Sequence, residues 1–190
     1  MQRENGILVG IVTDLDDPDN LGRVRVRFPY LGDQLSYWAK ISSPMAGKSR
    51  GFFFRPEKED ELLIAFEMGD PRRPYVLGAL WSKVDPPPED DGKKTDNNWR
   101  FIRSRSGNIF KFDDTDGSDR IEIIGKKTKI VLDSSGDKIE IVCETGNIEI
   151  QAPAGKLQLS ATDIEVKATG SMKLEAKGET TISGSVVNIN

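Results

Sequence analysis

The sequence predicts an all-β protein in which a small closed barrel is followed by a repetitive β-structure. Short apolar, β-branched runs separated by turn-forming residues fill the first 81 positions. From Ile139 onward, an apolar–polar–apolar triplet recurs about every eight residues. No stretch shows a sustained helical period, so the fold class is all-β.

Residues 1–81 are predicted to contain five strands. The segment 23–28 alternates strictly, which places Val24, Val26 and Phe28 on one face and three arginines on the other. Five short strands in about 80 residues suit a closed Greek-key barrel of the OB type, because closure removes unpaired sheet edges. The expected strands are residues 6–15, 23–28, 35–41, 61–67 and 75–81.

Residues 82–98 are predicted to be a linker. Three consecutive prolines at 86–88 favour a stiff polyproline II segment, and the polar remainder cannot bury a core. All 14 aromatic residues lie before residue 113, so the rest of the chain must be held together without large rings. The predicted domains are therefore the barrel in 1–81, the linker in 82–98 and the repetitive part in 99–190.

The repetitive part consists of seven triplets, each predicted to be a short strand with one apolar and one polar face. Five of the six gaps between triplets contain glycine, which suits tight corners. The same pattern starts upstream at 110–112, 121–123 and 130–132. The apolar positions are Ile139, Ile141, Ile148, Ile150, Leu157, Leu159, Ile164, Val166, Met172, Leu174, Ile182, Val187 and Ile189.

A single repeat cannot fold by itself. Its two aliphatic side chains contribute about 1.5–3 kcal/mol each when buried, whereas ordering eight residues of backbone costs about 8–16 kcal/mol. A calcium-binding solenoid needs Gly-Gly repeats, which the chain lacks, and a left-handed β-helix prefers a six-residue period. Three intertwined chains with the apolar residues on a common axis are the favoured arrangement. A single-layer sheet or a sandwich remains the alternative.

Composition limits the chemistry that the chain can perform. It has no histidine, one cysteine and a formal charge of −4, so His-based catalysis, histidine-ligated metals and internal disulfides are excluded. The charge gives no general attraction to nucleic acid or anionic lipid. The acidic segments 14–20 and 113–119 lack the spacing of an EF-hand and are interpreted as a solvated hairpin loop and a turn. We therefore expect no enzyme, no cofactor and no metal, and the apolar runs are too short to span a membrane.

Two local features allow sharper hypotheses. Arg23, Arg25 and Arg27 share one strand face, where they could contact acidic surface on a protein partner or on a neighbouring barrel. The alternative is a nucleic-acid-binding OB module with a solenoid tail, in which these arginines and the phenylalanines 52–54 contact a single strand. Cys143 follows Ile141 by two positions, so alternation turns its thiol inward.

Several ordered motifs resemble the VgrG-type central spike, or baseplate spike, proteins of contractile phage tails and related contractile injection systems. Residues 102–107 followed by 112–115 are similar to the neck that begins the triple-stranded β-helix of that family. The motifs that match the family's OB domain are Gly10–Asp14, Asp17–Pro18, Gly22–Pro29, Trp38–Ala39, Pro44–Gly47, Arg50–Gly51, Pro56, Asp60–Glu61, Ala65–Glu67, Gly69–Pro71 and Val76–Gly78.

The resemblance implies a homotrimer made in the cytoplasm and assembled into a phage tail or a phage-tail-like particle. Its OB domains would sit on a hub ring, with Arg23, Arg25 and Arg27 as hub-facing candidates, and its β-helix would puncture the target membrane on sheath contraction. A PAAR-type tip protein would dock on Val187, Asn188, Ile189 and Asn190. The 17-residue linker leaves no room for the lysozyme domain of some spikes, and the absence of a preceding hub-like domain implies a separate hub protein.

Overall fold

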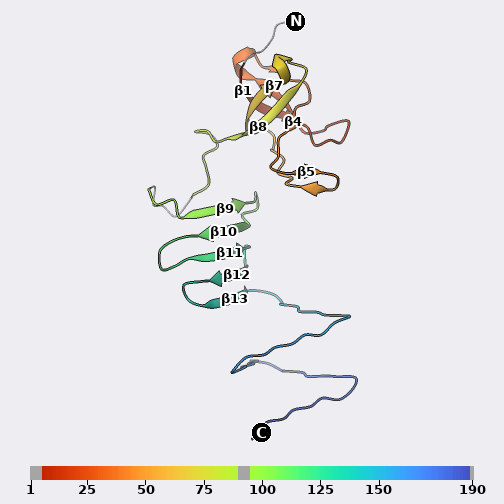
Figure 1. Ribbon diagram of the computed structural model, residues 1–190, viewed down its shortest axis with the longest axis vertical. Helices are drawn as coiled ribbons and strands as arrows, with labels where there is room; N and C mark the ends of the chain where they lie inside the picture. Colours follow the sequence, from red (N-terminus) through yellow and green to blue (C-terminus); the bar gives the residue numbers. More distant parts are fainter. Residues whose placement is uncertain (1–5, 90–94, 189–190) are drawn as a thin grey trace. The chain divides into compact units, whose positions relative to one another are not determined.

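The computed structural model describes residues 6–89 and 95–188. The chain divides into two compact units, the first ending at Val142 and the second beginning at Cys143. The first unit contains a six-stranded sheet, a two-stranded hairpin and a five-stranded sheet (Figure 1). In the described part of the chain, no helix has the length and apolar character needed to cross a bilayer.

The six-stranded sheet forms the predicted OB-type barrel. Its strands are β1 (Leu8–Asp14), β2 (Arg25–Phe28), β3 (Gln34–Leu35), β4 (Lys40–Ile41), β7 (Glu61–Phe66) and β8 (Pro74–Leu80), in the order β3-β2-β1-β7-β8-β4. All pairs are antiparallel except β4 with β8. Two 3₁₀ turns, Pro29–Leu31 and Glu67–Gly69, follow β2 and β7.

The predicted third strand, 35–41, is present as two short strands because it changes partner along its length. Its first part, β3, pairs with β2, and its last part, β4, pairs in parallel with β8. Between them Ala39 exchanges two backbone hydrogen bonds with Val24, at 2.8 and 3.1 Å. This bridge joins the β2 side of the sheet to the β4 side, which is the closure that an OB barrel requires.

The barrel core is small and aliphatic. Alternation along β1, β2 and β7 turns Val12, Val26 and Ile64 inward, and each is fully buried. The remaining members of the core are Val24, Phe28, Ala39, Leu62 and Val76. Gly10 on β1 lies so close to Val26 that a Cβ atom there would stand 2.6 Å from the Val26 Cγ2. Glycine is therefore required at this position by packing.

We predict that Gly10→Ala destabilises the barrel by about 1–3 kcal/mol, because the added methyl group overpacks the core. Gly78→Ala on β8 is the matched control, since a Cβ there meets no atom within 4 Å. Urea unfolding followed by tryptophan fluorescence measures both free energies of unfolding. Equal stabilities for the two variants would contradict the packing argument.

Residues 46–51 form a hairpin that the sequence analysis did not predict. Its strands, β5 (Ala46–Gly47) and β6 (Arg50–Gly51), have only two residues each. They are too short to show any alternation, which is why no pattern revealed them. The hairpin lies in the connection between β4 and β7.

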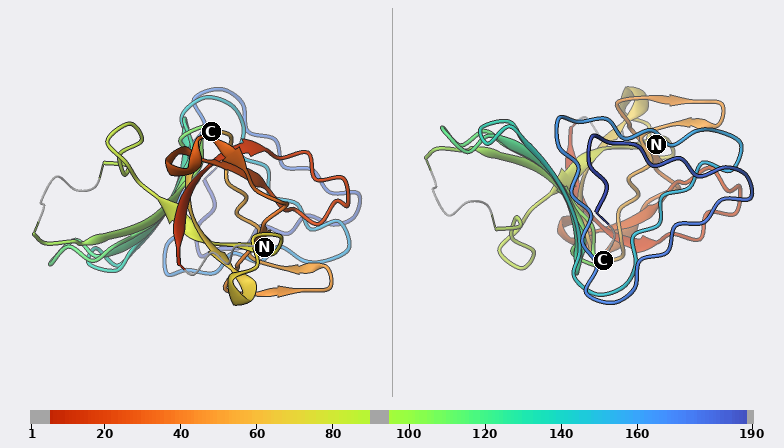
Figure 2. Two further views of the ribbon diagram at one scale, coloured as in Figure 1. Left: turned by 90° about the horizontal axis from the view of Figure 1, so that it is seen from above. Right: turned by 90° about the horizontal axis from the view of Figure 1, so that it is seen from below.

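The five-stranded sheet is an antiparallel meander. Its strands are β9 (Trp99–Arg103), β10 (Ile109–Asp113), β11 (Arg120–Ile124), β12 (Thr128–Asp133) and β13 (Lys138–Cys143), in the order β13-β12-β11-β10-β9. Figure 2 shows these green strands lying over one another as a single layer. Within one chain, residues 99–143 therefore adopt the single-layer arrangement that the sequence analysis kept as the alternative.

The second unit is extended chain that runs back and forth (blue in Figure 1). No strand occurs in residues 144–188, although six of the predicted triplets begin there. A strand is defined by hydrogen bonds to a neighbouring strand, and these residues have no such neighbour in the single chain. The intertwined trimeric β-helix and the predicted domain boundaries remain predictions.

Candidate assembly interface

The five-stranded sheet has one apolar face. The registers place Phe110 opposite both Ile102 and Ile123, and Phe112 opposite Ile121. Directly opposed residues share a face, so these side chains form continuous cross-strand rows. The rows continue on β12 with Ile130 and Leu132.

This apolar face is open. Ile102, Phe110 and Ile123 keep 51%, 38% and 47% of their surface exposed, although each is hydrogen-bonded within a strand of the sheet. Together with Ser104, Asn108 and Gly125 they line a shallow groove of about 500 Å³. In the described part of the chain, no second layer covers these rows. An apolar surface of this extent is typical of an interaction site.

The opposite face of the same sheet carries a cluster of paired charges beside apolar residues such as Ile109 and Val131. Lys111 and Asp113 on β10 are only 6% and 3% exposed. The Lys111 ammonium lies 3.4 Å from the Asp113 carboxylate, forms an ion pair with Glu122 on β11, and stands 3.9 Å from the centre of the Trp99 ring. Arg120 lies 3.5 Å from Asp113 and 3.3 Å from Glu122.

The prediction that the central residue of each triplet faces water is wrong for Lys111 and Glu122, which are buried and half-buried. Burial opposes ionisation of Asp113, but hydrogen bonds from Thr115 and the charge of Lys111 bring its pKa below the ordinary value. The polar face therefore satisfies its own charges across three strands. The apolar face is the one that lacks a partner.

The apolar triplet positions at the end of the sheet and in the second unit are also exposed. All predicted axis residues from Ile139 to Val187 are 50–76% exposed. Ile189 lies outside the described residues. Cys143 is half-buried at the end of β13, two positions beyond Ile141, with its thiol 3.5 Å from the Thr145 carbonyl. The pattern that predicted the axis is thus present on the molecule as an uncovered surface.

The predicted tip-docking segment is only partly described. Val187 is 50% exposed and Asn188 is exposed. Ile189 and Asn190 lie outside the described residues.

The three arginines predicted to face a hub are each engaged within the barrel. Arg23 forms ion pairs with Asp17 and Asp19. The Arg25 Nε donates to the Ser36 carbonyl at 3.2 Å, and its guanidinium lies 5.7 Å from the centre of the Trp38 ring. These partners reduce the positive charge available for phosphate groups.

Arg27 completes this set on the same strand. Its guanidinium lies 3.0 Å from Asp33 and 3.4 Å from Glu59. These ion pairs raise the pKa of Arg27, with the hydrogen bond to Asp33 as the main cause. Hub contact by these arginines remains a prediction.

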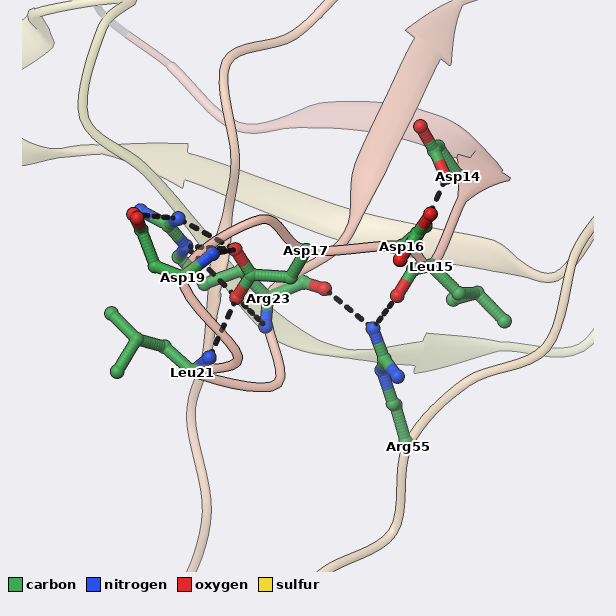
Figure 3. Close-up of polar contacts among 8 residues, drawn as sticks. All are labelled: Asp14, Leu15, Asp16, Asp17, Asp19, Leu21, Arg23 and Arg55. Carbon is green, nitrogen blue, oxygen red and sulfur yellow. Dashed lines mark hydrogen bonds and ion pairs between the residues drawn. The ribbon is translucent and has the colours of Figure 1, made fainter.

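The loop between β1 and β2 is organised by one buried carboxylate (Figure 3). Asp17 accepts backbone hydrogen bonds from Asp19, Leu21 and Arg23 at 2.9–3.1 Å, and its Oδ1 lies 2.6 Å from the Arg23 Nη2. The Arg55 guanidinium donates to the carbonyls of Arg23, at 3.0 Å, and of Leu15. The interpretation of this loop as a merely solvated hairpin is wrong at Asp17, whose burial follows from this network.

The Arg23 side chain holds the pKa of Asp17 far below the ordinary carboxyl value of 3.8, and the three backbone donors act in the same direction. A pKa that is lower in the folded than in the unfolded protein stabilises the fold above the unfolded value. This stabilisation is complete above about pH 5 and is lost as the pH falls through 3.8 towards the folded value.

We predict that Asp17→Asn lowers the melting temperature of the barrel at pH 7 by several degrees and weakens its dependence on pH between about 5 and 2. Asp16→Asn is the matched control, since Asp16 is exposed and its carboxylate makes no hydrogen bond in the structure. Thermal melts across this pH range measure both effects. If the melting temperature of Asp17→Asn fell between pH 5 and 2 as steeply as that of the unsubstituted protein, the role of the Asp17 carboxylate would be contradicted.

Comparison with known proteins agrees with this geometry. Residues 8–81 match the family model of the type VI secretion system/phage-baseplate injector OB domain. The chain is 27% identical over 117 residues to the type VI secretion system spike protein VgrG3 of Vibrio cholerae, covering 57% of this chain and 12% of that protein. It is 27% identical over 117 residues to the actin cross-linking toxin VgrG1 of Vibrio cholerae, covering 57% of this chain and 11% of that one.

A third relative is the type VI secretion system spike protein VgrG4b of Pseudomonas aeruginosa, which is 30% identical over 112 residues and covers 54% of this chain and 14% of that protein. The chain therefore spans a small part of the curated relatives that it matches. Residues 8–81 are thus similar to the injector OB domain, and the matches confirm the resemblance to VgrG-type spike proteins.

Proposed function

We propose that the chain is the structural central spike of a contractile injection machine, and that it works as a homotrimeric needle. The OB barrels couple to a hub protein ring, the repetitive part forms the needle, and a PAAR-type tip protein caps the end at residues 187–190. Sheath contraction then drives the needle through the target membrane, with which contact is transient. The trimer is assembled into the baseplate of a phage tail or of a phage-tail-like particle.

One observation carries this proposal. Apolar rows lie uncovered on β9–β12, and the apolar triplet positions from Ile139 to Val187 are exposed in the single chain as well. Removing apolar surface from water contributes about 25 cal/mol per Å², so covering these rows is strongly favourable. Because the rows repeat at a regular spacing, further copies of the same chain present a matching set.

The mechanical argument follows from the winding of three chains. When each copy supplies one strand per level, every backbone group pairs within the bundle and the interior remains dry. Shearing one chain then requires breaking hydrogen bonds to two others. Such a rod transmits axial force without a cofactor or a catalytic residue, so we propose no enzymatic activity.

The hub-facing surface is placed on the barrel, with Arg23, Arg25 and Arg27 as candidates. For Arg23 and Arg27, hub contact would extend existing ion pairs, whereas Arg25, which contacts the Ser36 carbonyl and the Trp38 ring, would gain its first ion pair among the described residues. Charged groups at the rim of an interface chiefly direct orientation and association rate.

The trimer is tested first by mass in solution and by substitutions on the apolar rows. We predict a mass of about three times 21.1 kDa by analytical ultracentrifugation. Ile150→Asp and Leu174→Asp should abolish the trimer, because three carboxylates would meet on a dry axis. Glu149→Asp, at the central polar position of the same triplet as Ile150, should leave it intact. Trimers in both apolar-row variants would contradict the assignment of the axis.

A further inference from the structure

The connection between β4 and β7 has a charge opposite to that of the chain as a whole. Residues 42–56 contain Lys48, Arg50 and Arg55 and no acidic residue, whereas the whole chain has a charge of −4. We call residues 42–56 the basic hairpin segment. A local concentration of one sign favours a partner of the other sign.

The basic hairpin segment also exposes large apolar side chains. Phe52, Phe53 and Phe54 are 53%, 78% and 63% exposed, and Met45 is 48% exposed. The Phe52 and Phe54 rings stack with their centres 6.5 Å apart. Exposed aromatic rings beside basic residues are the composition of a docking site for protein.

This segment is held in a defined conformation at its base. The Ser43 hydroxyl contacts the carbonyls of Met45 and Phe52 at 3.0 and 2.8 Å. The Arg55 guanidinium donates to the Arg23 carbonyl at 3.0 Å, which ties the end of the segment to the barrel. By contrast, Lys48 and Arg50 form no ion pair with any described residue. The charges available for a partner are therefore these two.

A second segment, residues 84–89, is acidic and proline-rich, so its charge is complementary to that of the basic hairpin segment. Asp85 and Glu89 flank prolines 86–88, and Val84 before them is 86% exposed. Neither carboxylate forms an ion pair within residues 6–89 and 95–188. Proline-rich segments dock on aromatic surfaces at a low entropic cost, because their polyproline II conformation is already formed.

The barrel topology brings the two segments to the same end of the barrel. Strands β4 and β8 are parallel, with Ile41 opposite Val76. The basic hairpin segment follows the end of β4, and residues 84–89 follow the end of β8. Copies related by a three-fold axis therefore present both segments at the same level.

We propose that the basic hairpin segment of one copy binds the acidic, proline-rich segment 84–89 of a neighbouring copy. Lys48 and Arg50 face Asp85 and Glu89, and the phenylalanine rings cover the prolines. A second copy is the occupant because the charges of both segments are left unpaired within the single chain. The inference rests on the proposed trimer and adds an interface outside the needle that joins adjacent barrels.

Disulfide cross-linking in the full chain tests this contact. In a Cys143→Ser background, one chain carries Phe53→Cys and a differently tagged chain carries Val84→Cys, and the two are produced together. We expect a covalent link between the two tagged chains under mild oxidation. Tyr30→Cys replaces Phe53→Cys as the control, since Tyr30 is equally exposed but follows β2 at the opposite end of the barrel.

Charge reversal is the second test of the contact between the two segments. Lys48→Glu with Arg50→Glu should lower the yield of linked chains about fivefold, because two exposed ion pairs become repulsive. Adding Asp85→Lys and Glu89→Lys should restore the yield. A mere structural disturbance would not be reversed by the second pair of substitutions.

The outcomes separate this inference from the proposed function. Trimers without a link between chains overturn the inference alone. A further variant carries Phe53→Cys and Val84→Cys in the same chain. If its disulfide forms only within single chains, the inference is overturned as well, since the occupant is then the chain's own segment. A single-copy mass in ultracentrifugation overturns the proposed trimer and this inference together.

Discussion

The open apolar face of the sheet β9–β13 determines what the rest of the chain requires. Every strand needs partners for its backbone groups, and every row of aliphatic side chains needs cover. Within β9 to β12 the meander supplies the backbone partners, and the Lys111 cluster satisfies the charges of the polar face. After Cys143 neither need is met by the single chain, so the repeats remain extended and exposed.

The barrel is the opposite case. It closes on itself through the bridge between Val24 and Ala39, and its core is complete without another molecule. Its loop between β1 and β2 is likewise satisfied internally by the Asp17 network. A self-sufficient barrel joined to a dependent repeat separates the tasks of the two parts. The barrel provides a stable base, and the repeat gains rigidity only by assembly.

Sequence patterns were informative where a residue's environment is set by local alternation. The two-residue alternation of apolar and polar residues predicts four of the five barrel strands. It also predicts the strands at Phe110, Ile121, Ile130 and Ile139. The third barrel strand is divided because it exchanges one partner for another at Ala39, a tertiary event without a local signal. Strands of two residues, as in the hairpin at 46–51, have no period to detect.

The candidate interface likewise combines features that local alternation predicts with features that only tertiary contacts determine. The apolar rows could be predicted because their spacing is regular, whereas the burial of Lys111 could not, since it depends on Trp99, Asp113 and Glu122 from three strands. Asp17 was likewise one of several carboxylates in its loop. Only the fold reveals that its oxygens meet three backbone donors and one guanidinium.

The dependence of residues 146–188 on other copies is tested most directly by hydrogen–deuterium exchange read by mass spectrometry at several protein concentrations. Exchange of an amide slows when it is hydrogen-bonded in a stable structure. The account predicts slow exchange throughout this segment in the assembled protein, and exchange at the rate of an unstructured chain when dilution releases single copies, while the barrel stays protected. Protection of residues 146–188 in a single copy would contradict it.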